Sequence, residues 1–252
     1  MGKMTEEDRL MRRINQRFMK GVMNYKLIEE GDRILVGLSG GKDSLALLEL
    51  LARRSRIYKP KFSVVAAHVV MKNIAYESDQ TYLREYAESL GVPYVCYETE
   101  FDPSTDTRKS ACFLCSWNRR KALFTVAKEQ GCNKIALGHH MDDILETLLM
   151  NMTFQGAFST MPPRLVMRKF DMTIIRPMCL VHEADLKEMA ALRGFRKQVK
   201  NCPYEKDSHR SDMKEMLARL EAMNPEARYS LWGSMNNIQH DMLPVEEDDS
   251  LK

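Results

Sequence analysis

One short run near residue 40 combines residue types that bind phosphate. It reads Ser39-Gly40-Gly41-Lys42-Asp43-Ser44 and lies between an apolar segment at residues 34–38 and an amphipathic segment at 42–54. Adjacent glycines let the backbone turn tightly and bring several N–H groups close to an anion. A helix that begins there directs its positive end at the same anion. The run therefore predicts a phosphate cradle at a strand-to-helix turn.

This run is not the common ATPase loop. The pattern G-x-x-x-x-G-K-[ST] fails because Asp43 follows Lys42 and no glycine lies five positions before Gly41. An acid inside an anion-binding turn requires a cation, so we expect Asp43 to hold Mg²⁺ beside the phosphate. The alternative is a glycine-rich turn with a structural role only.

A second polar cluster follows a later apolar segment, at residues 138–147. His139 could contact phosphate or nucleotide there, Asp142 could help to hold the metal, and Glu146 lies one helical turn after Asp142. The alternative is that Asp142 and Asp143 cap a helix beside solvated histidines. Ligands gather at the carboxyl ends of parallel strands, so two such clusters favour a shared site.

Two cysteines form a CxxC motif, and a third stands apart. Cys112 and Cys115 directly precede a predicted helix that carries Arg119, whose charge and helix dipole would favour thiolates. With Cys202 they make three thiolates, which are too few for a closed zinc site. Three suit an iron–sulfur cluster with one open iron, or a redox pair with a resolving thiol. A fortuitous CxxC is the remaining interpretation.

The other three cysteines are Cys96, Cys132 and Cys179. Cys96 and Cys132 are interpreted as small buried apolar residues. Cys179 stays open as an alternative ligand because it precedes Cys202 in the same region.

Apolar periodicity alternates between strand and helix along the chain. The pattern predicts a doubly wound α/β fold with a mostly parallel five-stranded sheet. Strands are expected at residues 33–38, 62–70, 94–98, 134–138 and 172–176, and helices at 8–29, 42–54, 78–90, 114–130, 141–155, 183–193, 208–223 and 227–237. The expected parts are a basic helix at 1–30, the ATP-binding domain at 31–180, a helical region at 181–240 and an acidic, disordered tail at 241–252.

Composition excludes a membrane protein. The chain has 252 residues, of which 44% are hydrophobic and 29% charged, with a net charge of +3. No segment reaches the length of about 18 apolar residues that a membrane span needs, and the N-terminus lacks a signal sequence, so a cytoplasmic protein is expected. Four consecutive acids at residues 246–249 leave the folded body more basic than the total suggests.

These motifs together resemble the tRNA 2-thiocytidine synthetases of the PP-loop ATP pyrophosphatase superfamily. The similarity extends from the basic N-terminal helix to Asn237. It rests on the phosphate run, the CxxC before an arginine-rich helix, the 138–147 cluster, the Met161-Pro162-Pro163 loop and the late Cys202. The superfamily implies an adenine nucleotide alpha hydrolase-like fold.

The resemblance implies that sulfur replaces the 2-oxygen of cytidine 32 in tRNA. The base oxygen would attack the α-phosphate of ATP and release pyrophosphate, and sulfur would then attack C2 and expel AMP. The implied partners are tRNA, ATP and a sulfur donor supplied by a cysteine desulfurase. The oligomeric state stays open, a homodimer included.

The resemblance also assigns residues. Lys42 would stabilise developing charge, Asp43 would hold Mg²⁺, and a [4Fe-4S] cluster on Cys112, Cys115 and Cys202 would carry the sulfur. Pyrophosphate would lie on the backbone of Ser39, Gly40, Gly41, Lys42, Asp43 and Ser44. The adenosine would lie among Leu38, His68, Val69, Val70, Gly138 and His139.

Basic residues outside the ATP site are candidates for tRNA contact. Arg119 and Arg120 could reach a tRNA phosphate or the activated base, with a solvated helix face as the alternative. Phosphate positioning is also expected from the two terminal regions, through Arg12, Arg13, Arg17, Lys214 and Arg219. A loop between Gly156 and the prolines 162–163 is expected to order when tRNA binds.

Three other functions compete with this interpretation. Related 2-thiouridine synthetases carry extra zinc-binding pairs at both ends, which this chain lacks, although base choice is not encoded in any motif. Lysidine synthetases share the ATP loop but need no cysteine cluster. A nucleotide-sensing or redox-sensing protein without turnover would have less need of the metal-binding acids Asp43 and Asp142.

Overall fold

The computed structural model describes residues 4–57, 59–72, 79–100, 102, 111–196 and 209–244, with the backbone alone at 111–113. Cys202 and most of the acidic tail therefore lie outside the described residues. The chain forms two compact units, which are described separately. The first comprises Met1–Ile144 and Thr160–Ser208, and the second comprises Leu145–Ser159 and His209–Lys252.

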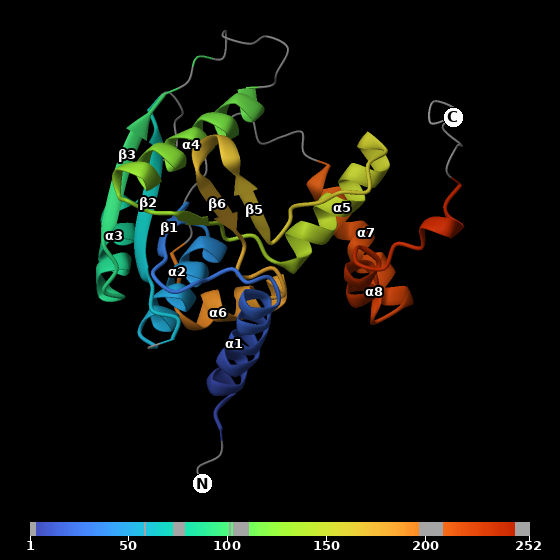
Figure 1. The fold of residues 1–252 in the computed structure, drawn as a ribbon. Coiled ribbons are helices and arrows are strands. Elements are labelled where there is room, and N and C mark those ends of the chain that lie inside the picture. The colour runs from blue at the N-terminus through green and yellow to red at the C-terminus, as the bar shows by residue number, and fades with distance from the viewer. Residues whose placement is uncertain are drawn as a thin grey trace. The chain divides into compact units, whose positions relative to one another are not determined.

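A six-stranded sheet organises the first unit, in the order β3-β2-β1-β4-β6-β5 (Figure 1). All neighbouring pairs are parallel except β5 and β6. The strands are β1 (Arg33–Gly37), β2 (Ser63–Met71), β3 (Tyr94–Thr99), β4 (Lys134–Ala136), β5 (Arg164–Met167) and β6 (Met172–Ile175). The predicted doubly wound α/β fold is confirmed, and the five parallel strands are the five that the apolar pattern predicted.

The prediction of five strands is wrong by one, because it missed β5. This edge strand has only four residues, follows two prolines and alternates between exposed and half-buried positions. It pairs antiparallel with β6 through Arg164 opposite Ile175 and Met167 opposite Met172. A short edge strand with one solvated face lacks the continuous apolar run that marked the central strands.

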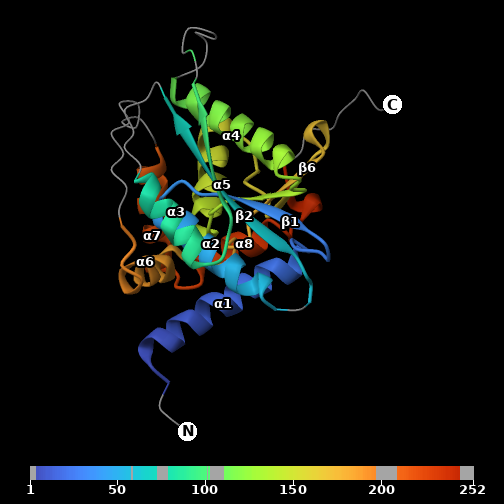
Figure 2. The same cartoon turned by 90° about the vertical axis from the view of Figure 1, so that its left-hand side faces the viewer.

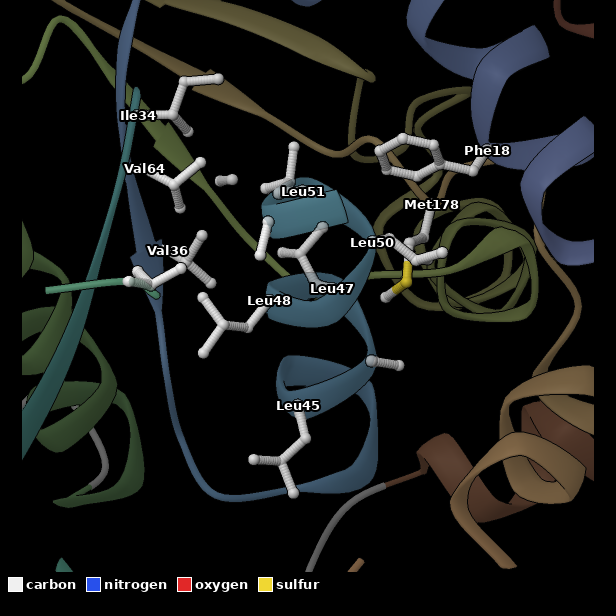
Figure 3. Packing of buried hydrophobic residues seen from close by; sticks show 14 of the residues in the cluster. Phe18, Ile34, Val36, Leu45, Leu47, Leu48, Leu50, Leu51, Val64 and Met178 are labelled. Atoms are coloured by element: carbon white, nitrogen blue, oxygen red, sulfur yellow. The ribbon is translucent and has the colours of Figure 1, made fainter. Parts of the chain in front are cut away.

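Helices cover both faces of this sheet (Figure 2). One apolar cluster joins α1, α2, α3 and α6 to Ile34 and Val36 of β1. In Figure 3, Leu48 and Leu51 of α2 lie on the side of β1, and Leu50 lies beside Phe18 and Met178. The opposite face packs Leu35 of β1 against Phe124 and Val126 of α4. Side chains alternate between the two faces of a strand, so β1 serves both clusters.

The described helices agree with most of the predicted ranges. They are α1 (Glu6–Asn24), α2 (Lys42–Ser55), α3 (Gln80–Ser89), α4 (Ala111–Glu129), α5 (Met141–Gln155), α6 (Glu183–Leu192), α7 (Arg210–Met223) and α8 (Ala227–Ser234). None of the helices in the described ranges is long and apolar enough to cross a membrane.

The second unit contains α7, α8 and most of α5. Met213 and Leu217 of α7 are buried, and Arg228 of α8 forms an ion pair with Glu221. Phe154 of α5 stacks on His209, with ring centroids 4.5 Å apart. The predicted metal-proximal residue Glu146 lies in this unit, where Arg210 Nε is 3.7 Å from its carboxylate.

Candidate active site

The phosphate run occupies the turn from β1 to α2, as its sequence context predicts. Gly40 has a φ of 81°, a conformation that favours glycine. Gly41 is the N-cap residue of α2, and no side chain caps the helix there. The Ser44 hydroxyl donates to the Gly41 carbonyl at 2.8 Å and so tightens the turn. The positive end of α2 is thereby left to an external anion.

The loop after β4 packs directly against this turn. A Cβ atom on Gly138 would lie 3.0 Å from the carbonyl carbon of Asp43 and 3.1 Å from the Ser44 nitrogen. Only a glycine permits so close a contact between two backbones without displacement. The structure therefore brings together the two polar clusters that the sequence placed at one edge of the sheet.

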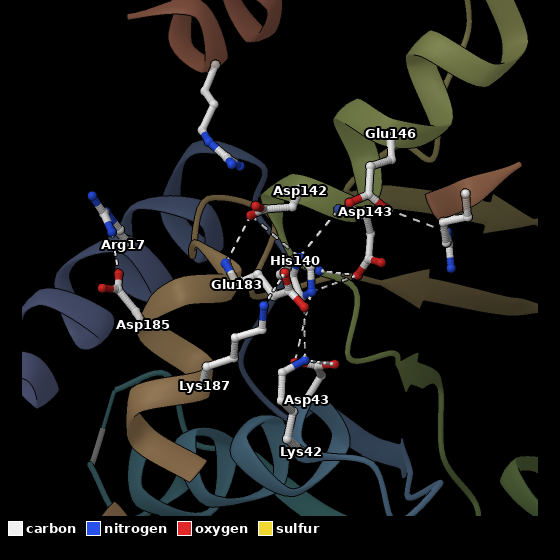
Figure 4. Close-up of polar contacts among 12 residues, drawn as sticks. Arg17, Lys42, Asp43, His140, Asp142, Asp143, Glu146, Glu183, Asp185 and Lys187 are labelled. Atoms are coloured by element: carbon white, nitrogen blue, oxygen red, sulfur yellow. Dashed lines mark hydrogen bonds and ion pairs between the residues drawn. The ribbon is translucent and has the colours of Figure 1, made fainter. Parts of the chain in front are cut away.

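His140 contributes the central side chain of this edge (Figure 4). It is buried, with Nε2 3.9 Å from Asp43 and 3.4 Å from Asp143 and Nδ1 3.7 Å from Asp142. Sequence reasoning chose the half-buried His139 instead and missed His140. The two histidines are consecutive, and no sequence pattern indicates which one faces the phosphate run.

Glu183, at the start of α6, is a second residue that the sequence analysis missed. Its carboxylate lies 3.4 Å from Lys42 Nζ and 3.1 Å from Lys187. Its backbone nitrogen donates to Asp142 Oδ2 at 2.9 Å, so Asp142 caps α6. Glu183 lies 141 residues after Lys42 and 41 residues after Asp142, so only the folded chain reveals that it positions both.

The donors around Asp43 fit a magnesium ion shared with phosphate. Asp43 Oδ1 is buried and makes no hydrogen bond, although Lys42 Nζ lies 3.0 Å away. Within the described part of the chain, no group of three or more His, Cys, Asp or Glu side chains is arranged to hold a metal ion. Mg²⁺ commonly binds through one or two carboxylates and completes its shell with phosphate oxygens and water, which this arrangement suits.

The predicted adenosine edge lies at the ends of β1 and β2. His68 Nδ1 is 2.7 Å from the Leu38 carbonyl oxygen, and the Leu38 nitrogen donates to the Ala67 carbonyl at 2.8 Å. Burial lowers the pKa of His68, and the charge of Arg119 lowers it further. A neutral imidazole that donates from Nδ1 to the Leu38 carbonyl satisfies this geometry. The influence of Arg119 on the pKa of His68 indicates that α4 lies near the same edge.

The CxxC motif lies inside the first turn of α4, not before the helix as predicted. Cys112 and Cys115 are therefore separated by about one helical turn of backbone. Cys115 is buried with Val69, Met71 and Leu114, next to the predicted adenosine edge; Val70 is half-buried. The CxxC spacing and its place at a helix N-terminus fit thiolate ligands of a cluster.

Cys179 does not suit the role of alternative ligand. Its side chain is fully buried, and burial raises the pKa of its thiol to about 12. A Cβ on Gly21 of α1 would lie 3.0 Å from its Sγ atom, so α1 covers it. It is an inert core thiol.

Two of the predicted tRNA-binding arginines have an internal role. Arg13 Nε lies 2.8 Å from the buried Asp185 of α6, and Arg17 also forms an ion pair with Asp185. Both therefore join α1 to α6. Arg12 is exposed on α1.

Comparison with known proteins identifies the family. Residues 7–211 match the family model described as PP-loop domain. The chain is 38% identical over 237 residues to the tRNA-cytidine(32) 2-sulfurtransferase of Syntrophotalea carbinolica, covering 92% of each. The corresponding protein of Neisseria meningitidis is 37% identical over 92% of this chain and 74% of its own. The chain belongs to the PP-loop family of tRNA-cytidine(32) 2-sulfurtransferases.

The resemblance drawn from the motifs is thus confirmed. Among solved structures, the U34-tRNA thiolase NcsA of Methanococcus maripaludis, determined with its [4Fe-4S] cluster, superposes with a TM-score of 0.73. It shares 22% sequence identity and covers 94% of this chain and 81% of its own. At that identity the likeness establishes the PP-loop fold.

Proposed function

We propose that this PP-loop family member is an ATP-dependent tRNA thiolase that converts cytidine 32 to 2-thiocytidine. Its curated relatives carry that activity in their names, at 34–38% identity. The observation that supports it best is a chain of contacts at one sheet edge. Leu38, which precedes the phosphate run, meets His68, and the next residue, Val69, packs with Cys115. Activation and sulfur transfer would then share one edge.

In the first step, the C2 oxygen of the cytidine attacks the α-phosphate of ATP. The bond between the α-phosphorus and the bridging oxygen breaks, and pyrophosphate leaves with that electron pair. The backbone of residues 39–44 and the positive end of α2 would hold the leaving pyrophosphate, and Lys42 would neutralise its developing charge. Asp43 would hold Mg²⁺, which polarises the phosphate oxygens when bound. His140 and Glu183 orient Asp43 and Lys42 for this step.

In the second step, sulfur attacks C2 of the adenylated base. The C2–O bond breaks, and AMP leaves with the former base oxygen. A [4Fe-4S] cluster held by Cys112, Cys115 and Cys202 would supply this sulfur as sulfide, and a thiol reductant would provide the two electrons that convert the persulfide sulfur of a cysteine desulfurase to sulfide. Arg119, half-buried beside His68, would stabilise the negative charge on the departing AMP.

The product assay tests this function. Anaerobically reconstituted protein is incubated with ATP, Mg²⁺, sulfide and unmodified tRNA, and pyrophosphate and thionucleosides are quantified. We expect 2-thiocytidine at position 32, lost in Cys115→Ala and retained in Cys132→Ala, a buried cysteine beyond the other end of α4. Thiouridine as the product would show the uridine-specific alternative. Nucleotide binding without either product would contradict the enzyme and favour a sensor.

A further inference from the structure

Arg176 is a buried cation without a counter-anion. It follows β6 directly at the carboxyl edge of the sheet, and its side chain is 6% exposed. Its Nη1 donates to the Pro162 carbonyl at 2.6 Å, and its Nε has no hydrogen-bond partner. Among the described residues no carboxylate forms an ion pair with it. A buried charge without a partner is costly, so an external anion is expected to supply the missing charge.

The charged and titratable groups near Arg176 do not supply the negative charge that would balance it. Burial, and after it the charge of Arg120 on α4, lowers the pKa of Arg176 to about 10, so the guanidinium is still protonated at neutral pH. The neighbouring Cys179 is a neutral thiol, because burial raises its pKa to about 12. Arg120 thus adds positive charge near Arg176, and no carboxylate within the described ranges forms an ion pair with Arg176.

Local structure holds Arg176 in this position. Its backbone nitrogen donates to the Pro163 carbonyl at 2.8 Å, so both prolines of the 161–163 motif orient it. The Leu137 nitrogen donates to the Ile175 carbonyl at 3.0 Å, which places Arg176 beside the loop that begins at Gly138. That loop is the one packed against the phosphate run. Arg176 therefore belongs to the same edge as the candidate active site.

We propose that Arg176 is the centre of a phosphate-binding subsite at the carboxyl end of β6, next to the phosphate run, to which the exposed Arg120 adds positive charge. A guanidinium suits the oxygens of a phosphate group, because its planar fork donates two parallel hydrogen bonds. The buried Nε–H of Arg176 has no acceptor among the described residues. The phosphate comes from the nucleotide or from the tRNA backbone. Only the identity of these two phosphate donors, nucleotide and tRNA, rests on the proposed function.

Equilibrium binding tests the subsite without turnover, so its outcome is independent of thiolation. One arm titrates the protein with α,β-methylene-ATP and Mg²⁺, and the other titrates it with an unmodified tRNA transcript at several salt concentrations. We expect Arg176→Gln to weaken one probe about 10- to 100-fold, the range for a lost charge-assisted hydrogen bond. Arg120→Gln should weaken the same probe by a smaller factor. Arg176→Lys should recover part of the affinity.

Two comparisons separate binding from folding. Lys128→Gln removes an exposed charge from the far end of α4 and should leave both affinities unchanged. The melting temperature of Arg176→Gln should stay the same or rise, since an unpaired buried charge is removed. Weaker binding of α,β-methylene-ATP alone would show that the subsite takes a phosphate of the nucleotide. Weaker binding of tRNA alone, with a smaller dependence of the affinity on salt concentration, would show that it takes a phosphate of the tRNA backbone. If both affinities stay within about twofold of the wild type in Arg176→Gln and Arg120→Gln, the subsite does not exist.

Discussion

The two ends of the parallel strands treat buried cations differently. At the amino end, Lys134 of β4 is 3% exposed and lies 2.7 Å from both Asp32 and Glu29. At the carboxyl end, Arg176 is almost as buried but has no acidic partner among the described residues. The buried Lys134 has its counter-charge within the chain, whereas the buried Arg176 leaves its counter-charge to the proposed ligand.

The same difference applies to the carboxylates. Asp32 at the amino end accepts from the Glu29 nitrogen at 2.6 Å and from Asn133 at 2.7 Å, in addition to its ion pair with Lys134. Asp43 at the carboxyl end accepts one hydrogen bond, from Lys42 Nζ to Oδ2 at 3.0 Å, and its buried Oδ1 accepts none. We therefore expect substitutions at the amino end to reduce stability and those at the carboxyl end to reduce activity.

The largest effect is expected from Asp43→Asn. The amide keeps the shape but loses the charge that holds Mg²⁺, so pyrophosphate release should fall by about 10²–10³. Its melting temperature should stay near that of the wild type, because Asp43 is only partly buried. Rapid-quench measurement of pyrophosphate gives the rate, with Glu129→Gln on the exposed end of α4 as the control. Normal release by Asp43→Asn would remove the metal assignment.

Lys134→Met tests the opposite end of the sheet. It leaves the buried Asp32 without its cation, so the free energy of unfolding should fall by about 3–5 kcal/mol. Urea denaturation measures this loss, and the activity per folded molecule should be unchanged. A stable but inactive Lys134→Met protein would break the proposed division between the two ends.

Gly138→Ala sharpens the comparison within the active-site edge. Its new Cβ meets the Asp43 and Ser44 backbone at 3.0–3.1 Å, which should cost about 1–3 kcal/mol of stability and weaken ATP binding. Gly233→Ala in α8 is the matched control, because no atom lies within 4 Å of its Cβ position. Calorimetric titration with ATP that shows equal affinity for both variants would contradict the close packing of the two loops.

His68 gives the smallest effect, and its sign follows from its pKa. Burial lowers this pKa from its ordinary value of 6.5, so the unfolded chain binds a proton before the folded protein does. Stability should therefore fall as the pH drops from about 6.5 to the folded pKa, by up to about 1.4 kcal/mol per pH unit. Urea unfolding at pH 7.5 and 5.5 measures this. His68→Gln should reduce the difference between the two pH values, and an unchanged difference would show that another group is responsible.

Sequence patterns predicted the fold well where burial is continuous. The central strands and α2 follow from apolar runs and from the turn at Gly40-Gly41, and they place the phosphate run without tertiary information. The edge strand β5 was missed because a short, half-exposed strand carries no such run. The first turn of α4 was missed for a different reason, since residues 111–114 form an unbroken run of apolar residues that shows no helical period.

The site was predicted in outline, and its missing members are set by tertiary contacts. Motif spacing identified Lys42, Asp43 and Cys115, because the chemistry itself requires those residue types. His140 and Glu183 depend on the direction of a loop and on the docking of α6, which no local pattern specifies. Arg176 was missed because its significance is the absence of a nearby acid, a property of the folded chain alone.

The most direct test of the account follows the oxygen that leaves the base. A tRNA carrying ¹⁸O at C2 of cytidine 32 is thiolated in a single turnover, and the AMP is analysed by mass spectrometry. Attack of the base oxygen on the α-phosphate predicts that one ¹⁸O atom appears in AMP for each 2-thiocytidine formed. Recovery of the label in water or pyrophosphate, with unlabelled AMP, would contradict adenylation at the carboxyl edge of this sheet.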